Sequence, residues 1–256
     1  MTDYREKIAA EILRVKAVLR ENAESQKLDE FLKFVPGAQN ALAVRTPVID
    51  DVVSSIWKER PQNDERYIVA ACEALWTADS YYEERKVAIR LLEKLVKNNS
   101  ESVMNLVNQW KEDIHTWDLC DQMGMRCSGN CLALSFEFYM PDIQYWSQRS
   151  ELWVRRLGIV SLVKLRNQLL TKEQWDEIME IFNVVWDDNR HYIKKGLAWS
   201  LRELSKLNPI LVSEFLESQI RESSLNKSFG LQFLRESVKK LDMKTQERLV
   251  GLFRQN

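Results

Sequence analysis

Residues 171–185 read TKEQWDEIMEIFNVV and show how this chain folds. Trp175, Ile178 and Phe182 recur at the spacing of one helix face, and charged residues occupy many of the positions between them. Thr171 stands just before this run, where a hydroxyl can cap the first backbone N–H groups of a helix. The segment therefore predicts an amphipathic helix that turns one apolar stripe inward.

The same pattern repeats outward from this segment. A turn at residues 187–189 leads into a second helix over residues 192–207, which Asn208 and Pro209 end. Helix pairs of this kind recur at intervals of about 35–45 residues along the chain, as they do in HEAT-like repeats. The 7 Gly and 5 Pro are too few for the turns of a many-stranded sheet. We therefore expect an all-α fold, a HEAT-like helical-repeat solenoid with a curved surface, in a single domain over residues 1–256.

Apolar periodicity and turn residues place the other helices. Thr46 and Pro47 predict a helix start, with Thr46 as the cap and Pro47 at the first helical position. Residues 123–125, Met-Gly-Met, predict an interruption before helix resumes at Cys127. The remaining helices are expected over residues 3–22, 25–34, 64–78, 83–96, 102–110, 152–165, 210–222, 229–240 and 243–254.

The chain is close to neutral overall. Its 37 Lys and Arg against 38 Asp and Glu give a net charge of −1, whereas nucleic-acid-binding proteins usually show a basic balance. The neutral balance does not exclude a local basic patch, because numerous charges of both signs can lie on different faces of the protein. The first residues lack an apolar signal segment, and no apolar run approaches the ~20 residues of a membrane span. We expect a soluble, cytoplasmic protein, and a monomer because nothing in the sequence demands an oligomer.

The four cysteines, Cys72, Cys120, Cys127 and Cys131, raise the question of a metal site. The last three lie close to His115 in the sequence. No paired C-x-x-C is present, and the spacing fits no ordinary zinc module. Because a free Cys is commonly a small buried apolar residue, we expect reduced thiols, no metal and no cofactor.

Residues 115–121, HTWDLCD, hold the first candidate functional residues. Trp117 and Asp121 are four apart, so on a helix an indole and a carboxylate project from one surface. Farther along, Arg155 and Arg156 interrupt the start of an apolar helix. Each of these residues also has a purely structural interpretation, because Trp packs well in a core, Asp caps helices and buried Arg pairs with carboxylates.

Further basic and aromatic residues follow the same pattern. Lys194 and Lys195 precede Trp199 on a later helix, and Arg85 and Lys86 lie in the helix expected over residues 83–96. Basic faces are often merely solvated, so solvation and phosphate binding both remain open for these residues. If the helices line one wall, aromatic, acidic and basic groups converge there, which suits a site for phosphate-linked sugars.

Four segments resemble the AlkD-type DNA alkylation repair glycosylases. They lie in that family's order and at similar separations, and together they cover about residues 67–209. The segments are residues 83–89, EERKVAI; residues 117–121, WDLCD; residues 153–159, WVRRLGI; and residues 192–203, YIKKGLAWSLRE.

The resemblance implies a HEAT-like fold with a basic, concave cleft that binds double-stranded DNA. The implied activity is hydrolysis of the N-glycosidic bond of N3- or N7-alkylated purines. By position in the motifs, the resemblance assigns Trp117 and Asp121 to the lesion's deoxyribose, Arg156 to a phosphate and Trp199 to the cleft. Further contacts to DNA are expected from Arg155, Arg85, Lys86, Lys194 and Lys195.

The residue types agree with this chemistry. Breaking the glycosidic bond of a cationic purine builds positive charge on the sugar, which a nearby carboxylate stabilises while it orients water. Indole faces hold the same cation through cation–π attraction.

The sequence also departs from the family at several places. Asp50 and Asp51 stand where family members commonly carry Arg or Lys, and Gly196 stands where Ala is more usual. Together with the low net charge, these departures leave an alternative, a non-catalytic HEAT-repeat protein that binds DNA structures or a protein partner.

Overall fold

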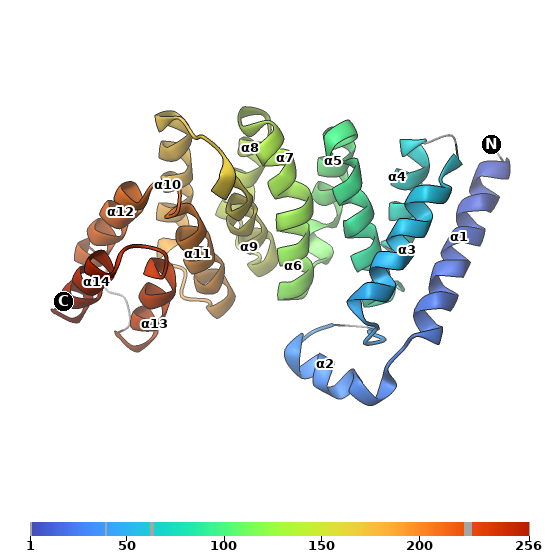
Figure 1. Ribbon diagram of the computed structural model, residues 1–256, viewed down its shortest axis with the longest axis horizontal. Helices are drawn as coiled ribbons and strands as arrows, with labels where there is room; N and C mark the ends of the chain where they lie inside the picture. Colours follow the sequence, from blue (N-terminus) through green and yellow to red (C-terminus); the bar gives the residue numbers. More distant parts are fainter. Residues whose placement is uncertain (1, 39, 62–63, 223–226, 256) are drawn as a thin grey trace. The chain divides into compact units, whose positions relative to one another are not determined.

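The computed structural model describes residues 2–38, 40–61, 64–222 and 227–255, and within these ranges the regular elements are all helices (Figure 1). The all-α prediction is therefore confirmed. The chain packs as two compact units, Met1–Cys131 and Leu132–Asn256, called here the N-terminal and the C-terminal unit. The single domain expected from the sequence stays a prediction. In the described part of the chain, no helix combines the length and the apolar character that a membrane crossing requires.

The N-terminal unit packs its helices as antiparallel layers around α5. Helix α4 packs against both α1 and α5, and α3 packs against α5. Ile68, Cys72, Leu91 and Leu92 are fully buried and form part of this core. The helices of this unit are α1 (Thr2–Glu21), α2 (Leu28–Phe34), α3 (Thr46–Glu59), α4 (Glu65–Leu75), α5 (Tyr82–Trp110) and α6 (Trp117–Met123), and α7 (Gly129–Leu134) begins in it.

One local prediction for this unit was wrong, and another was confirmed. Thr46 is the first residue of α3 and not its cap, which is Arg45. The expected helices 83–96 and 102–110 lie in one helical run, α5, and the break between them is present as a kink at Asn99, whose φ of −150° and ψ of 58° are not helical. The Asn99 side chain accepts a hydrogen bond from the backbone N–H of Ser102 at 3.2 Å and so restarts the helix.

The expected interruption at residues 123–125 is a π-helical turn, Gly124–Ser128, that joins α6 to α7. Gly124, Ser128 and Gly129 are buried in this segment, which packs against α5. Their small size allows that close approach. The chain therefore stays helical here but changes from an α-helix to a wider π-helical turn.

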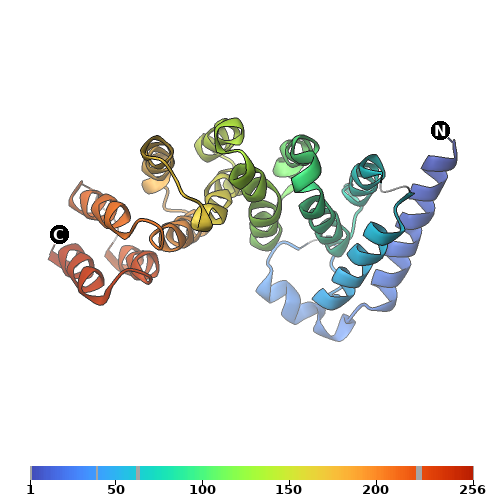
Figure 2. The ribbon, with the colours of Figure 1, turned by 45° about the horizontal axis from the view of Figure 1, so that its top comes forward.

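The C-terminal unit places α8 and α10 in one layer and α9 and α11 in the other (Figures 1 and 2). Thr171 caps the start of α10, as predicted, and it forms a capping box with Gln174. The helices of this unit are α8 (Phe136–Gln148), α9 (Leu152–Ser161), α10 (Lys172–Trp186), α11 (His191–Leu204), α12 (Pro209–Glu222), α13 (Lys227–Val238) and α14 (Met243–Gln255).

Helices α8 and α9 approach each other closely at Gly158. A Cβ added there would lie 2.4 Å from Oγ of Ser147 and 2.9 Å from the backbone oxygen of Ile143. Ser147 cannot easily give way, since it is buried and its hydroxyl donates to Ile143 O at 2.8 Å. Only glycine therefore permits this contact between the two helices.

Gly158→Ala should lower the free energy of unfolding by about 2 kcal/mol, because the added methyl group forces α8 and α9 apart. The matched control is Gly251→Ala in α14, where no heavy atom lies within 4 Å of the added Cβ. That change should raise stability by roughly 0.5–1 kcal/mol through helix propensity. Urea unfolding of both variants measures the difference, and equal stabilities would contradict the close contact.

Candidate functional site

The start of α6 positions the first candidate pair. Thr116 is fully buried and caps the helix, since its hydroxyl oxygen accepts the backbone N–H of Leu119 at 3.2 Å. Trp117 is then the first helical residue, and Asp121 follows one turn later. Both side chains are half-buried. The expected sharing of one face by an indole and a carboxylate is therefore present in the N-terminal unit.

The Trp117 indole is held by the end of α2. Its Nε1–H donates to the backbone oxygen of Phe34 at 3.1 Å. The Phe34 ring meets the indole edge to face, with ring centroids 5.3 Å apart and an interplanar angle of 86°, and Phe34 remains 69% exposed. These contacts fix the plane of the indole and place a second, exposed aromatic ring beside it.

A second carboxylate of α6, Asp118, faces α5. It accepts hydrogen bonds from the Tyr82 hydroxyl and from Nε2 of Gln122, the latter at 3.0 Å, and it pairs with Lys86 at 3.3 Å. Burial, and then the charge of Asp118, raise the pKa of Tyr82 well above its usual range. The Lys86 ammonium, expected at phosphate, is thus engaged within the protein, and its side chain is only 13% exposed.

Arg85 also points into the protein, where its contacts help to hold the segment that precedes α6. Its guanidinium donates to the backbone oxygens of Asp113 and Thr77 at 3.2 and 3.0 Å and lies 3.1 Å from Nε2 of His115. It also stacks over the Trp76 ring at 5.2 Å. Burial, and then the Arg85 charge, lower the pKa of His115. The hydrogen-bond donors of Arg85, which we expected to contact DNA, are therefore bonded to groups within the protein.

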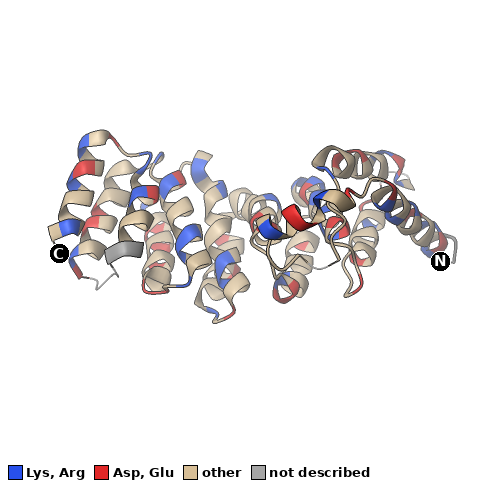
Figure 3. Cartoon of the chain, turned by 90° about the horizontal axis from the view of Figure 1, so that it is seen from below, with Lys and Arg blue, Asp and Glu red and all other residues tan. Residues whose placement is uncertain are grey.

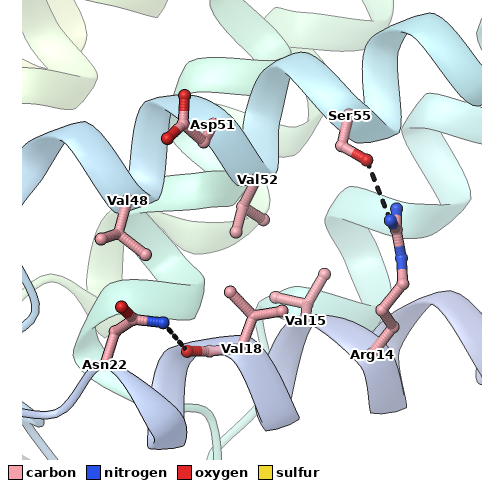
Figure 4. A pocket seen from close by; sticks show the side chains of 8 residues that line it. All are labelled: Arg14, Val15, Val18, Asn22, Val48, Asp51, Val52 and Ser55. Carbon is pink, nitrogen blue, oxygen red and sulfur yellow. Dashed lines mark hydrogen bonds between the residues drawn. The ribbon is translucent and has the colours of Figure 1, made fainter.

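Asp50 and Asp51, the acidic pair in α3, have separate surroundings. Asp50 pairs with Arg90 of α5. Asp51 lies at a pocket of about 310 Å³ between α1 and α3, which Val15 and Val52 help to line (Figure 4). Figure 4 also shows Arg14 reaching across the pocket to Ser55, at 2.9 Å. Asp50 therefore has a structural role, and Asp51 borders an opening of the N-terminal unit.

In the C-terminal unit, Arg156 of α9 is buried against α11. Its side chain, 4% exposed, donates through Nη1 to the backbone oxygen of Tyr192. A Cβ at Gly196 would lie 3.2 Å from the same Nη1 atom. The glycine that departs from the family pattern therefore makes room for this guanidinium.

Arg155 holds the end of α8. It donates to the backbone oxygens of Arg149 and Gln148 at 2.6 and 3.2 Å, and it pairs with Asp188 at 2.7 Å. Burial opposes the charge on Asp188, but hydrogen bonds from Arg190 and Arg155 outweigh it and lower the pKa of Asp188 to about 2. Arg155 therefore connects α8 to the turn before α11, a structural role that the sequence interpretation had left open.

Lys194 is the most deeply buried of the predicted DNA contacts, at 1% exposure. Its ammonium donates to the backbone oxygen of Trp186 and lies 5.2 and 5.1 Å from the ring centroids of Trp186 and Phe233. Burial lowers the pKa of Lys194 to about 8, although Asp187 and Asp188 act in the opposite direction. This cation joins α10, α11 and α13 and does not reach a surface.

The outward face of α11 carries the remaining predicted residues. Lys195 is exposed, and Trp199 lies one turn farther along, half-buried. Arg202 lies on the same face, seven residues after Lys195, an alignment that the spacing contains and our prediction missed, and Lys206 follows in the turn after α11. Arg202 pairs with Glu236 at 3.0 Å, and Lys206 pairs with Glu203. Figure 3 shows Lys and Arg on several helices of this unit.

The cysteines lie away from any such surface. All four are buried and form no disulfide, and burial raises the thiol pKa of each one for which a shift is resolved, to about 12 for Cys131. In the ranges that the structure describes, no group of three or more His, Cys, Asp or Glu side chains is placed to hold a metal.

Comparison with known proteins gives the family and the fold. The family model described as "DNA alkylation repair enzyme" matches residues 15–241. A predicted DNA alkylation repair enzyme from Enterococcus faecalis is 20% identical, with a TM-score of 0.70 over 87% of this chain and 98% of that one. AlkD2 from Streptococcus mutans is 21% identical, with a TM-score of 0.56 over 76% of this chain and 89% of that one.

A third structure, smu.31 from Streptococcus mutans UA159, is 19% identical, with a TM-score of 0.56 over 88% of this chain and 100% of that one. No curated protein matches the chain. At these identities the likeness is one of fold, and it confirms the helical-repeat prediction.

Titration of Lys194 should be visible in stability. Its folded pKa of about 8 lies below the ordinary value of 10.5, so between these pH values the unfolded chain binds more protons and stability rises with pH. The rise should approach about 1.4 kcal/mol per pH unit and should be absent below pH ~8, where both states are protonated.

Lys194→Met should remove this rise of stability with pH. Lys195→Met, a change at the exposed neighbouring residue, should keep it. Urea unfolding from pH 7 to pH 10 gives the three slopes. Equal slopes for the wild type and Lys194→Met would show that Lys194 does not titrate in the folded protein.

Proposed function

Because the chain belongs to the DNA alkylation repair enzyme family, we propose that it is a DNA glycosylase that hydrolyses the N-glycosidic bond of cationic N3- and N7-alkylated purines in duplex DNA. The observation that carries this proposal is the half-buried pair of Trp117 and Asp121, one turn apart on α6. The chemistry requires no cofactor, and one chain in the cytoplasm supplies every residue that it uses.

The reaction needs little activation of its leaving group. An alkyl group on N3 or N7 makes the purine cationic, so the departing base carries away no negative charge. Positive charge develops instead on the deoxyribose, and the Asp121 carboxylate stabilises this oxocarbenium-like state and orients the attacking water. The Trp117 ring adds cation–π attraction to the same charge.

The contacts of Trp117 support this role. A hydrogen bond to Phe34 O fixes the ring plane before DNA binds, so less conformational freedom remains to be lost in the transition state. Asp118, tied to Tyr82 and Lys86, is committed to packing α6 on α5. The two carboxylates of α6 therefore have separate tasks, and Asp121 is the one on the Trp117 face.

In the C-terminal unit, Lys195 and Trp199 share the outward face of α11 and are assigned to DNA contact, whereas Arg202 on the same face pairs with Glu236. Lys195 meets a phosphate, and Trp199 offers a flat apolar surface to a sugar. Arg156 and Lys194 act as positioning residues, since both are buried and each donates to a backbone oxygen. Lys86 and Arg85 play the same part for α6.

Asp121→Asn should reduce the release of N7-methylguanine and N3-methyladenine from methylated duplex DNA by at least about 100-fold, because the amide cannot stabilise the sugar cation. Asp118→Asn is the matched control on the same helix. It should lower the melting temperature, through loss of the Lys86 pair, and keep most of the excision rate. Full activity in Asp121→Asn would falsify the assignment of Asp121.

A second function, binding of DNA structures without excision, is favoured by the net charge of −1 and by the burial of Arg85, Arg156 and Lys194. It predicts that folded wild-type protein releases no base and binds branched DNA more tightly than linear duplex. The excision assay followed by a gel-shift series separates the two functions.

Lys195→Gln should weaken binding to duplex DNA and make the dependence of log affinity on log salt concentration less steep by about 0.9, the contribution of one phosphate contact. Lys172→Gln, an exposed lysine at the start of α10, is the control and should leave the slope unchanged. Fluorescence anisotropy across a salt series measures both. The same loss of slope in both variants would place the contact elsewhere.

A further inference from the structure

Helices α8 and α10 form a surface that the proposed glycosylase does not use. The two helices lie side by side and parallel, joined near their starts by a hydrogen bond from Gln174 to Glu137 at 2.7 Å. Gln144 donates to Glu177 at 3.0 Å farther along. A shallow groove of about 50 Å³ follows near their ends, lined by Gln144, Ser147, Gln148, Glu180, Ile181 and Val184.

Helix α8 turns an apolar stripe outward along this surface. Phe138 is 62% exposed and Tyr145 is 53% exposed, and the exposed Pro141 lies between them. Pro141 and Tyr145 follow Phe138 by three and seven residues, so the three side chains form one ridge along the helix. Because Pro141 has no N–H, the backbone oxygen of Glu137 also lacks its usual helical donor and faces the same way.

The core of the unit does not need this stripe. The opposite face of α8 is buried against α9, through Met140, Ile143 and Trp146 among others. Large apolar side chains that remain exposed at helical spacing are typical of a surface that another protein covers.

The charge beside the stripe is mainly acidic, and Arg149, the cation just after α8 that lies 5.6 Å from the Tyr145 ring centroid, pairs with Glu151 at 2.8 Å. Helix α8 contains Glu137 and Asp142 and no Lys or Arg, and α10 contains four acidic residues against Lys172 alone. Of these, Glu173, Asp176 and Glu180 are exposed. Such a face repels the phosphates of DNA and also repels the same face of a second copy.

From these observations we infer that the α8–α10 surface, defined by Phe138, Pro141, Tyr145, Asp176 and Glu180, docks a basic amphipathic helix of a partner protein. Apolar side chains of that helix cover the stripe, and its Lys or Arg residues pair with the acidic residues of α10. A helix fits better than an extended strand, because the described elements offer no sheet edge and a straight helical ridge packs into the groove of another helix.

The test uses a synthetic helical peptide of Leu and Lys, with Leu on one face, and the same peptide with Glu in place of Lys. Each peptide is titrated into the 256-residue protein, and NMR identifies the backbone amides whose chemical shifts change. The Lys peptide should shift amides of α8 and α10, and raised salt should weaken it. The Glu peptide should bind at least about tenfold more weakly.

Phe138→Ser combined with Tyr145→Ser should weaken the Lys peptide about tenfold, the effect expected when anchoring aromatic residues are lost. Ile210→Ser is the matched control, because Ile210 is 68% exposed on α12 of the same unit. Asp176→Asn combined with Glu180→Gln should remove much of the salt dependence. Excision of alkylated bases should be unchanged in all of these variants.

Three results would overturn the inference. The first is equal binding of the Lys and Glu peptides, and the second is unchanged binding by the Phe138 and Tyr145 variant. The third is self-association of the wild type in analytical ultracentrifugation that this variant abolishes, which would make a second copy the occupant. Because excision is measured separately, failure of the docking surface and failure of the glycosylase assignment are distinguishable.

Discussion

Backbone oxygens near helix ends and turns, satisfied by buried cations, are the interaction on which the rest of this structure depends. The last carbonyl groups of a helix have no partner within it, and cations are favoured there by the helix dipole. Arg155 donates to the oxygens at the end of α8, and Lys194 to the last oxygen of α10. Arg85 does the same for Thr77 and Asp113, around the ends of α4 and of the turn before α6. These three charges thus tie neighbouring helices and turns together.

This arrangement explains how the candidate residues are placed. Arg85 holds the segment that leads into α6, and so it sets where Trp117 begins the helix. Arg156 and Lys194 hold α11 against its neighbours, and so they set the face that carries Lys195 and Trp199. Removing one such cation leaves a buried oxygen without a donor, which costs about 1–3 kcal/mol. The motifs therefore combine residues that build the scaffold with residues that meet the substrate.

Periodicity predicted most of the helices, because apolar spacing reports directly which face is buried. It located the break near Asn99 but did not show that Gly124–Ser128 is a π-helical turn, because this turn depends on tertiary packing that no local pattern shows. For the candidate site, spacing correctly placed Trp117 and Asp121 on one face. It could not show that Arg85, Arg156 and Lys194 are buried, because a basic residue at a helix start looks the same whether it faces solvent or a neighbouring carbonyl group. The alignment of Arg202 with Lys195 on α11 could have been predicted from the same spacing.

The central claim is that burial divides the basic residues of these motifs into structural and DNA-contacting sets. Lysine acetylation followed by mass spectrometry, in the presence and absence of duplex DNA, tests it most directly. We expect Lys195 to be acetylated in the free protein and protected by DNA, whereas Lys194 stays unmodified in both samples. Acetylation of Lys194 in the free protein, with protection by DNA, would contradict this division and return Lys194 to the DNA-binding surface.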